Sequence, residues 1–341
     1  MNIRRLLVTG GAGFIGSNFI RYELEQYPDL HIVNFDKLTY AGNLDNLLGI
    51  DEHRYTFIRG DIADADALAN AMEGCDAAVN FAADTHVDRS ILGATEFIST
   101  NVTGVYNLLE QTRTKGLARL LLVSTDEVYG SIEKGSFRET DPVSPGNPYS
   151  ASKASGELIA LAHHRTYGTP VIITRGSNTY GPYQYPEKVL PLFVTNAIDN
   201  QPLPLYKGGE HNVRDWLFVR DHCSGIDCAL RRGTPGEIYN IAGGNERENI
   251  VLTRKILALL GKSEDLIRLV PDRPGHDRRY SIDASKLKKL GWAPQMDWDE
   301  GMALTVKWYQ ENEWWWRKVK SGEFLEYYKR QYGKRFADET S

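Results

Sequence analysis

Three glycines spaced three residues apart directly follow the first apolar segment of the chain. The segment 4–9 reads as a short buried strand and leads into GGAGFIG, where the glycines are Gly10, Gly13 and Gly16. The first glycine permits a tight turn, the second lets backbone amides approach a pyrophosphate, and the third lets the next helix pack close to the sheet. The pattern therefore predicts a strand–turn–helix unit that binds a dinucleotide at the N-terminus of the helix.

An acidic residue at the end of the next strand indicates which dinucleotide is bound. The apolar segment 31–35 ends in Asp36, twenty residues after Gly16. A carboxylate at this place accepts hydrogen bonds from both hydroxyls of the adenosine ribose and repels a 2′-phosphate. The combination predicts NAD rather than NADP as the cofactor.

Strand and helix patterns alternate along the first half of the chain, as a doubly wound parallel sheet requires. Beyond about residue 177, prolines crowd a region of short elements, which indicates a smaller lobe over the carboxyl edge of the sheet. We expect an α/β protein with a Rossmann-type doubly wound parallel sheet in residues 1–176. Residues 177–341 would form mainly a substrate-binding lobe, with part of 210–235 returning to the sheet. Further strands are predicted at 56–59, 77–81, 120–123 and 171–174, and helices at 66–72, 95–113 and 149–167.

Composition argues against several other classes of protein. The chain has 341 residues and a formal net charge of −5 without a basic block, so nucleic acid is not an expected partner. Its apolar runs are far shorter than the roughly eighteen residues that a membrane span needs. No signal segment precedes Arg4 and the three cysteines form no CxxC motif, which favours a cytoplasmic protein. The eight histidines show no HExxH spacing, and no metal site is expected.

Five polar residues near the middle of the chain indicate a proton-handling site. Thr125, Asp126 and Glu127 follow an apolar strand, and Tyr149 and Lys153 lie four apart on one face of a predicted helix. A lysine beside a phenol favours the phenolate, which makes the phenol a usable base. Two adjacent acids can share one site only if the strand has ended, because successive strand residues point to opposite faces. Each part alone is also typical of packing or of a solvated turn, but together with the dinucleotide motif they predict an enzyme.

Seven motifs together resemble the extended short-chain dehydrogenase/reductase superfamily, and within it the dTDP-glucose 4,6-dehydratases. The most specific mark is the pair Asp126-Glu127, because the 4-epimerases of the superfamily lack both acids and the decarboxylases usually keep only the glutamate. The motifs are GGAGFIG, HVDRSI, STDEVYG, YSASK, SNTYGPYQYPEK, NVRDWLFVRDHC and RPGHDRRYSIDASK. Three alternatives stay open: a dehydratase of UDP-, CDP- or GDP-sugars, a decarboxylase or 4-epimerase of the same superfamily, and a catalytically silent NAD-binding regulatory protein.

The resemblance implies an NAD-dependent hydro-lyase that converts dTDP-glucose to dTDP-4-keto-6-deoxyglucose and water. Tyr149, with its pKa lowered by Lys153, would take the proton of the sugar C4 hydroxyl, and Thr125 would hold the same oxygen. Glu127 would remove the C5 proton, and Asp126 would protonate the C6 hydroxyl as it leaves. Asp126 must then be protonated while Glu127 is ionised, which requires environments that push the two pKa values apart.

The resemblance also assigns the contacts of cofactor and substrate. Those of NAD are Gly10, Gly13, Phe14, Ile15, Gly16, Asp36, Lys37, Thr39, Asn43, Asp61, Ile62, Ala82, Ala83, Thr85, Tyr149, Lys153 and Asn178. Those of the sugar nucleotide are His86, Thr125, Asn178, Lys188, Val189, Pro204, Tyr206, Arg214, Asn249, Arg273, His276 and Tyr280. Arg214 and Arg273 suit the diphosphate, because a guanidinium donates to phosphate oxygens in a bidentate manner.

The sequence departs from the family pattern near the expected substrate entrance. Many members read RCSNNYG where this chain has RGSNTYG, with Gly176 and Thr179 at the two changed positions. These changes concern the choice of sugar or nucleotide and leave the expected reaction type unchanged.

The helices predicted at 95–113 and 149–167 carry more apolar residues than one face against a sheet needs. In the superfamily the equivalent pair meets its copy across a two-fold axis, so we expect a homodimer. The alternative is that the chain's own tail, with Trp314, Trp315 and Trp316, covers the outer faces of these helices.

Overall fold

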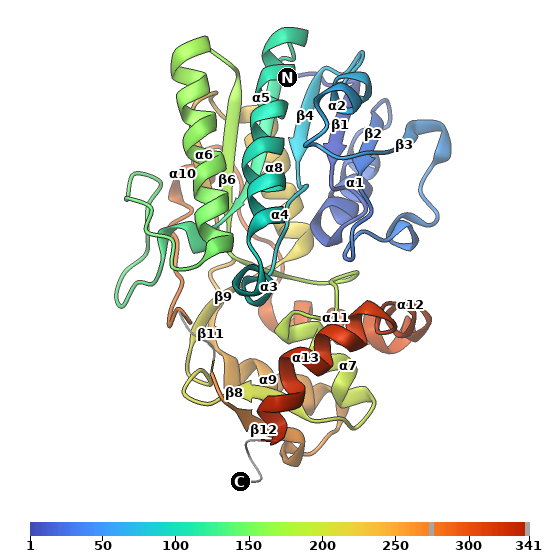
Figure 1. Cartoon of the computed structure of the whole chain (residues 1–341), viewed down its shortest axis with the longest axis vertical. Coiled ribbons are helices and arrows are strands. Elements are labelled where there is room, and N and C mark those ends of the chain that lie inside the picture. The colour runs from blue at the N-terminus through green and yellow to red at the C-terminus, as the bar shows by residue number, and fades with distance from the viewer. Residues whose placement is uncertain (273–275, 338–341) are drawn as a thin grey trace.

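A seven-stranded parallel sheet forms the centre of the computed structural model, which describes residues 1–272 and 276–337 (Figure 1). The strand order is β10-β6-β5-β4-β1-β2-β3, which confirms the predicted doubly wound sheet. Arg273, an expected diphosphate contact, lies outside the described residues. The strands are β1 (Arg5–Thr9), β2 (His31–Asp36), β3 (Tyr55–Arg59), β4 (Ala77–Asn80), β5 (Arg119–Thr125), β6 (Val171–Gly176) and β10 (Ile238–Ile241).

Helices cover both faces of the sheet, which is therefore buried on both sides. On one face α1 (Phe14–Gln26) packs against α8 (Val219–Arg232). On the other face α5 (Val105–Lys115) packs against α6 (Pro148–Tyr167) and α2 (Ala65–Ala71) (Figure 1).

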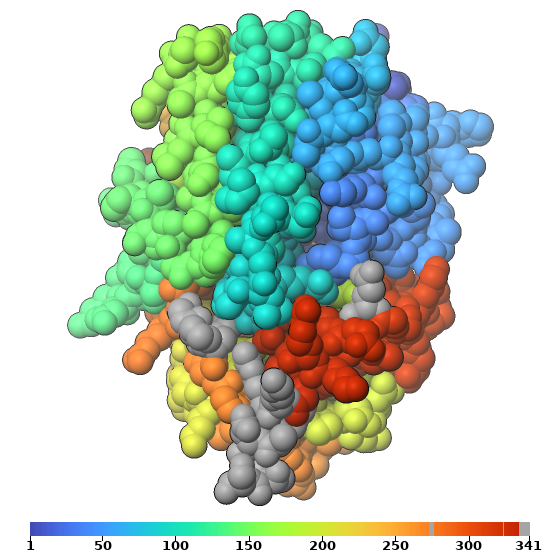
Figure 2. Space-filling model, in the orientation of Figure 1, coloured from blue at the N-terminus to red at the C-terminus, as the bar shows by residue number. Residues whose placement is uncertain are grey.

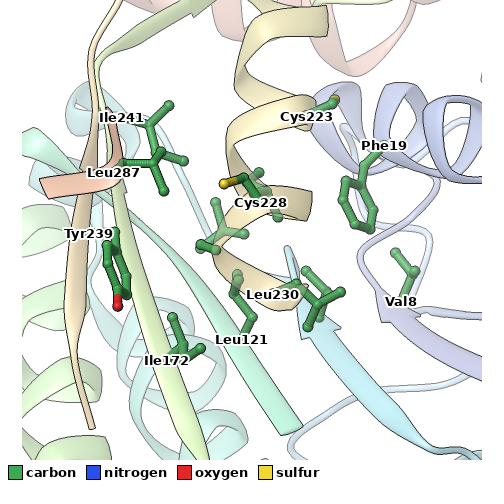
Figure 3. Close-up of a cluster of buried hydrophobic side chains, with 14 of the residues drawn as sticks. Val8, Phe19, Leu121, Ile172, Cys223, Cys228, Leu230, Tyr239, Ile241 and Leu287 are labelled. Carbon is green, nitrogen blue, oxygen red and sulfur yellow. The ribbon is translucent and has the colours of Figure 1, made fainter. Parts of the chain in front are cut away.

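Alternate residues of the strands enter two different hydrophobic clusters, because successive side chains point to opposite faces. Val8 packs with Phe19 of α1, and with Leu121 and Cys223, in the first cluster (Figure 3). Leu7, the neighbour of Val8, lies in the second cluster with the apolar residues of α5. The strands consequently read as continuous apolar runs in the sequence.

The helix predicted at 95–113 is interrupted in the structure. α4 (Thr95–Ile98) continues through η3 (Ser99–Gly104), a π-helical turn, into α5. The turn directs the buried Asn101 amide inward, where it accepts from Asp84 N at 3.0 Å and donates to Ser152 Oγ at 2.9 Å. Apolar periodicity does not predict this turn, and the hydrogen-bond partners of the Asn101 amide are distant in the sequence.

After β6 the chain builds the smaller lobe and returns to the sheet with α8 and β10. The returning part extends past residue 235, since β10 is an outer strand of the main sheet; the domain division at residue 176 stays a prediction. The strands of the lobe are β7 (Asn178–Tyr180), β8 (Leu203–Tyr206), β9 (Val213–Phe218), β11 (Glu246–Glu248) and β12 (Ile267–Val270). Its helices are α7 (Val189–Ile198), α9 (Asn249–Leu260), α11 (Trp298–Glu311), α12 (Glu313–Val319) and α13 (Glu323–Ala337).

Two of the three adjacent tryptophans of the tail belong to the core of the lobe. Trp315 and Trp316 are buried, and Trp314 is 52% exposed. Trp315 Nε1 donates to Asn46 Oδ1 at 2.8 Å, and Asn46 Nδ2 donates to the carbonyl of Ala12 in the glycine turn at 2.9 Å. In Figure 2, α5 and α6 (teal and light green) lie side by side at the surface, and the described part of the tail (red) runs along the lobe instead. The described part of the tail therefore does not cover these two helices.

Replacing Trp315 by Phe should keep most of the ring packing but leave the Asn46 amide oxygen without its donor. A buried acceptor that loses its partner costs about 1–3 kcal/mol, so we expect the free energy of unfolding in urea to fall by that amount. Trp314→Phe is the matched control at an exposed position and should change it by less than about 0.5 kcal/mol. Equal stability of the two variants would contradict the role given to this hydrogen bond.

Candidate active site

One cleft runs along the carboxyl edge of the sheet, beneath the lobe. Its walls include residues at or just after the ends of six strands, from β3 through β2, β1, β4 and β5 to β6. In an open parallel sheet this edge is where ligands bind, because the loops that leave the strands diverge there. The cleft therefore lies where the sequence predicts the cofactor.

The glycine turn has a shape that only glycine allows. Gly10 has φ +69°, and a Cβ there would lie 2.5 Å from Ala82 N. A Cβ at Gly16 would collide with the carbonyl oxygen of Gly10. Gly13 is the N-cap of α1 and makes no side-chain cap hydrogen bond, so the first amides of this helix face the cleft as donors for an anion.

Asp36 ends β2 as a buried carboxylate on the wall of the cleft. Its Oδ2 accepts from Ala12 N at 2.9 Å, and its Oδ1 accepts from Leu38 N at 2.8 Å. Burial raises the pKa of Asp36, and the two amides partly oppose this. A carboxylate oxygen with one amide partner can still accept a ribose hydroxyl. Beside it, Lys37 and Asp61 form an ion pair at 2.8 Å.

The two adjacent acids lie beyond the end of their strand. β5 ends at Thr125, and η4 (Asp126–Tyr129) is a single 3-10 turn. Thr125 Oγ1 accepts from Glu127 N at 3.2 Å and lies 3.3 Å from Asp126 Oδ1, to which it can donate. Because the acids lie in this turn and not in the strand, their side chains need not point to opposite faces, and both line the same cleft.

The surroundings of Asp126 favour its protonated form. Burial, and then the charge of Glu127, raise the pKa of Asp126 well above its usual value, while Arg214 opposes the shift only in part. Asp126 Oδ2 is buried and has no hydrogen-bond partner among the described residues. A carboxyl that stays protonated near neutral pH can act as a general acid.

The surroundings of Tyr149 shift its pKa upward. Tyr149 and Lys153 line the cleft from the first two turns of α6. Burial, followed by the charges of Glu127 and Asp126, raises the pKa of Tyr149. Lys153 Nζ donates to the carbonyl of Val123 at 2.8 Å, and burial lowers the pKa of Lys153 to about 8. The net shift of the Tyr149 pKa is therefore upward, with burial and the two carboxyls as its main causes, and the expected lowering by Lys153 stays a prediction.

The residues expected to bind substrate lie in separate groups. Thr125, Asn178 and Lys188 line the cleft. Arg214 and Tyr280 lie beside the acids, with the guanidinium 4.3 Å from the ring centroid. The guanidinium also donates to the carbonyls of Asp277 at 2.7 Å and Arg278 at 3.3 Å, and so supports the segment that carries Tyr280.

A further group lies deeper in the lobe, around Gly209. Tyr206 and His276 make a T-shaped ring contact with centroids 5.6 Å apart. Asn249 Nδ2 donates to the carbonyl of Gly209 at 2.9 Å, and Asn212 Nδ2 lies 3.3 Å from the His276 ring nitrogens. These side chains are distant in sequence and meet only because the lobe folds them together.

Four expected residues lie outside the wall of the cleft and outside these groups: Asn43, His86, Val189 and Pro204. Asn43 caps η1 (Leu44–Leu47), where its side chain accepts from Asp45 N at 3.0 Å. His86 is buried against Tyr327 of α13, with ring centroids 5.7 Å apart. Every other residue expected to contact NAD lines the cleft.

Gln184, Glu187 and His222 are among the polar residues of the cleft wall that sequence reasoning missed. Glu187 is buried and accepts from Tyr40 Oη at 3.0 Å and from Arg89 Nε at 2.9 Å. None of the three has a characteristic spacing, although Gln184 and Glu187 lie within the motif SNTYGPYQYPEK and His222 lies within NVRDWLFVRDHC. Their position could be known only from the folded chain.

The described residues contain neither a metal-binding cluster nor a membrane-spanning helix. Within residues 1–272 and 276–337, no group of three His, Cys, Asp or Glu side chains is arranged to hold a metal ion. In the same part of the chain, no helix combines the length and the apolar composition that a membrane span requires.

Replacing Asp36 by Ala should weaken NAD binding, because two charge-assisted hydrogen bonds to the ribose would be lost. Hydrogen bonds to a charged group are worth about 1.5–3 kcal/mol, so we expect the dissociation constant of NAD, measured by calorimetry, to rise by at least about tenfold. Asp51→Ala, which changes an acid distant from the cleft, is the control. An unchanged affinity for NAD in Asp36→Ala would contradict the assignment.

Comparisons with known proteins give the family. The family model described as GDP-mannose 4,6 dehydratase matches residues 7–305. A dTDP-glucose 4,6-dehydratase of Streptomyces niveus is 50% identical over 323 residues, which cover 93% of this chain and 96% of the relative. The dTDP-glucose 4,6-dehydratase DesIV of Streptomyces venezuelae, solved with NAD bound, superimposes with a TM-score of 0.90 at 52% identity and covers 93% of this chain and 100% of that one. The enzyme of the same name from Bacillus anthracis, also solved with NAD, gives a TM-score of 0.86 at 50% identity and covers 93% of this chain and 99% of that one. The chain belongs to the dTDP-glucose 4,6-dehydratases.

Proposed function

We propose that this chain converts dTDP-glucose to dTDP-4-keto-6-deoxyglucose and water, with NAD as a tightly bound catalyst. The observation that carries this is the pair of acids on η4, which lie beside Thr125 and share the cleft with Tyr149. Oxidation at C4 alone needs only the tyrosine, whereas the removal of water across C5 and C6 also needs a base and an acid. Relatives of about half identical sequence that carry this name support the choice of substrate.

The cleft suits NAD in shape and in chemistry. In the glycine turn, Gly10 and Gly16 pack too closely against backbone atoms to carry a side chain, which leaves the turn open to a pyrophosphate. Asp36 offers acceptors to the adenosine ribose. When bound, NAD supplies an oxidised nicotinamide that takes the C4 hydride, returns it to C6, and carries a positive charge that favours the Tyr149 phenolate. Solved relatives that hold NAD support this choice.

Tyr149 and Thr125 would act on the C4 hydroxyl of the sugar. Tyr149 Oη would take its proton, and Thr125 Oγ1 would hold the same oxygen as it becomes a ketone. Lys153 lies one turn further along α6, and its Nζ is fixed by Val123 O. Its charge would act on the reacting groups from a constant position.

The two acids would then divide the elimination between them. The new C4 ketone acidifies the C5 proton, which Glu127 would remove. Asp126, whose raised pKa keeps it protonated, would give its proton to the C6 hydroxyl, which leaves as water. Glu127 would return its proton to C5 as the hydride reaches C6, and the cofactor would end in its starting state.

A cytoplasmic location fits this chemistry and the thiol content of the chain. Cys75, Cys223 and Cys228 are all free thiols. Free buried thiols are typical of proteins in a reducing compartment.

With dTDP-glucose, the purified protein should form a 4-keto sugar nucleotide without added cofactor, read from the absorbance that alkali induces. Asp126→Asn should slow turnover by about 10²–10⁴-fold while sparing oxidation, so enzyme-bound NADH should accumulate. Tyr149→Phe should block oxidation itself and leave the cofactor as NAD. Wild-type turnover by Asp126→Asn would exclude Asp126 as the acid, and the absence of product from the unchanged protein would overturn the proposed function.

A homodimer through α5 and α6 is part of the same proposal. Their inner residues, such as Val105 and Ala154, are buried against the rest of the chain. Tyr106 of α5 and Leu158 of α6 are exposed by 48% and 57%, and Ile98 of the preceding α4 is exposed by 52%. Large apolar side chains gathered on two adjacent helices are typical of a protein–protein interface.

Light scattering should therefore give a mass of twice the 38.5 kDa of one chain. Leu158→Glu should shift the protein toward the monomer, because it would bury a charge in the apolar interface. Leu304→Glu, at an exposed leucine of α11 in the lobe, is the matched control and should leave the mass unchanged. A single-chain mass at all concentrations would contradict the dimer.

A further inference from the structure

His222 of α8 is a cleft residue to which the proposed reaction assigns no part. Its side chain lines the cleft and is only 2% exposed. Burial lowers the pKa of His222 to about 3, so the ring is neutral near neutral pH. Its Nε2 has no hydrogen-bond partner among the described residues. A buried polar atom in this state costs free energy unless a ligand or water completes it.

The hydrogen bonds of Thr179 determine which ring nitrogen carries the proton. Thr179 Oγ1 lies 3.1 Å from the carbonyl oxygen of Ser177, to which it can only donate its single proton. The same oxygen lies 2.7 Å from His222 Nδ1. With its proton directed at Ser177 O, the Thr179 hydroxyl accepts from Nδ1–H, and Nε2 is left as an acceptor.

The backbone beside the ring is shaped for it. A Cβ at Gly176 would lie 2.6 Å from both Cε1 and Nε2 of His222, so only glycine leaves room for the ring in this position. Gly176 and Thr179 are the two residues at which the sequence departs from the RCSNNYG pattern. Both departures thus adjoin the same imidazole.

The His222 ring lies at the end of the cleft where the nicotinamide would bind. Gly176 of β6 pairs with Thr125 of β5, whose hydroxyl would hold the sugar C4 oxygen. Hydride transfer requires nicotinamide C4 to lie close to the sugar C4, and the carboxamide group is bonded to the adjacent ring carbon. The carboxamide supplies N–H donors, which an acceptor nitrogen needs.

We propose that His222 accepts a hydrogen bond from the nicotinamide carboxamide through Nε2 and so fixes the orientation of the nicotinamide ring. This inference rests on the proposed function, since it requires NAD in the cleft. His222 would then contact the cofactor, and Thr179 would be a positioning residue that acts through the tautomer of the ring.

The test compares NAD with 3-acetylpyridine adenine dinucleotide, in which a methyl group replaces the carboxamide NH₂ and no N–H donor remains. The purified protein is equilibrated with both dinucleotides in the absence of sugar nucleotide, denatured, and the released dinucleotides are quantified. The unchanged protein should retain NAD in preference by about tenfold, as the loss of one buried hydrogen bond implies.

His222→Leu should bring this preference close to one, and His222→Gln, which keeps an acceptor, should retain part of it. Thr179→Val should also reduce the preference, because the ring loses the partner that fixes its tautomer, and Thr179→Ser should restore it. If His222→Leu does not fold, the comparison of Thr179→Val with Thr179→Ser tests the proposal instead.

A preference that stays the same in His222→Leu, or in Thr179→Val if the first variant does not fold, would show that the ring is only structural and overturn the proposal. Because the readout is binding without substrate, it is separate from turnover. Failure to process dTDP-glucose with the preference intact would overturn the proposed function and leave this contact standing.

Discussion

The carboxyl ends of β1, β2, β4, β5 and β6 meet at one edge of the sheet because these strands pair in parallel register. The last residue of each strand, or one just after it, therefore lines the same cleft: Gly10, Asp36, Ala82, Thr125 and Gly176. The glycine turn, the acids and the ring of His222 depend on this pairing. A shift of one residue in β5 would turn the Thr125 side chain to the opposite face of the sheet, away from the cleft.

Burial of charge is the second constraint on the cleft. Asp126, Tyr149 and Lys153 are all shifted toward their neutral forms, and desolvation is the largest cause in each case. The same effect that suits Asp126 as an acid works against Tyr149 as a base. An added positive charge beside the phenol, such as that of the oxidised cofactor, would favour the phenolate.

The lobe and the tail stabilise the cleft from outside. Trp315 is linked through Asn46 to the glycine turn. Arg89 lies between the rings of Tyr40 and Tyr327, with its guanidinium carbon 3.6 Å and 4.6 Å from their centroids, and pairs with buried Glu187. In Figure 1, α13 accordingly passes close to α3 (Val87–Leu92), where the lobe meets the sheet. These contacts join segments that are far apart in the sequence.

The spacing of particular residues along the sequence determined much of the fold and of the site, because spacing follows directly from the geometry of strands, turns and helices. Glycines three apart after an apolar strand, and Asp36 after the next one, were enough to predict the parallel sheet and the cofactor. The four-residue spacing of Tyr149 and Lys153 was enough to put both on one face of a helix. Only the tertiary structure decided the raised pKa of Tyr149, the π-helical turn at Asn101, the capping role of Asn43 and the position of His222. Each of these depends on burial, or on partners in space, that no spacing along the chain encodes.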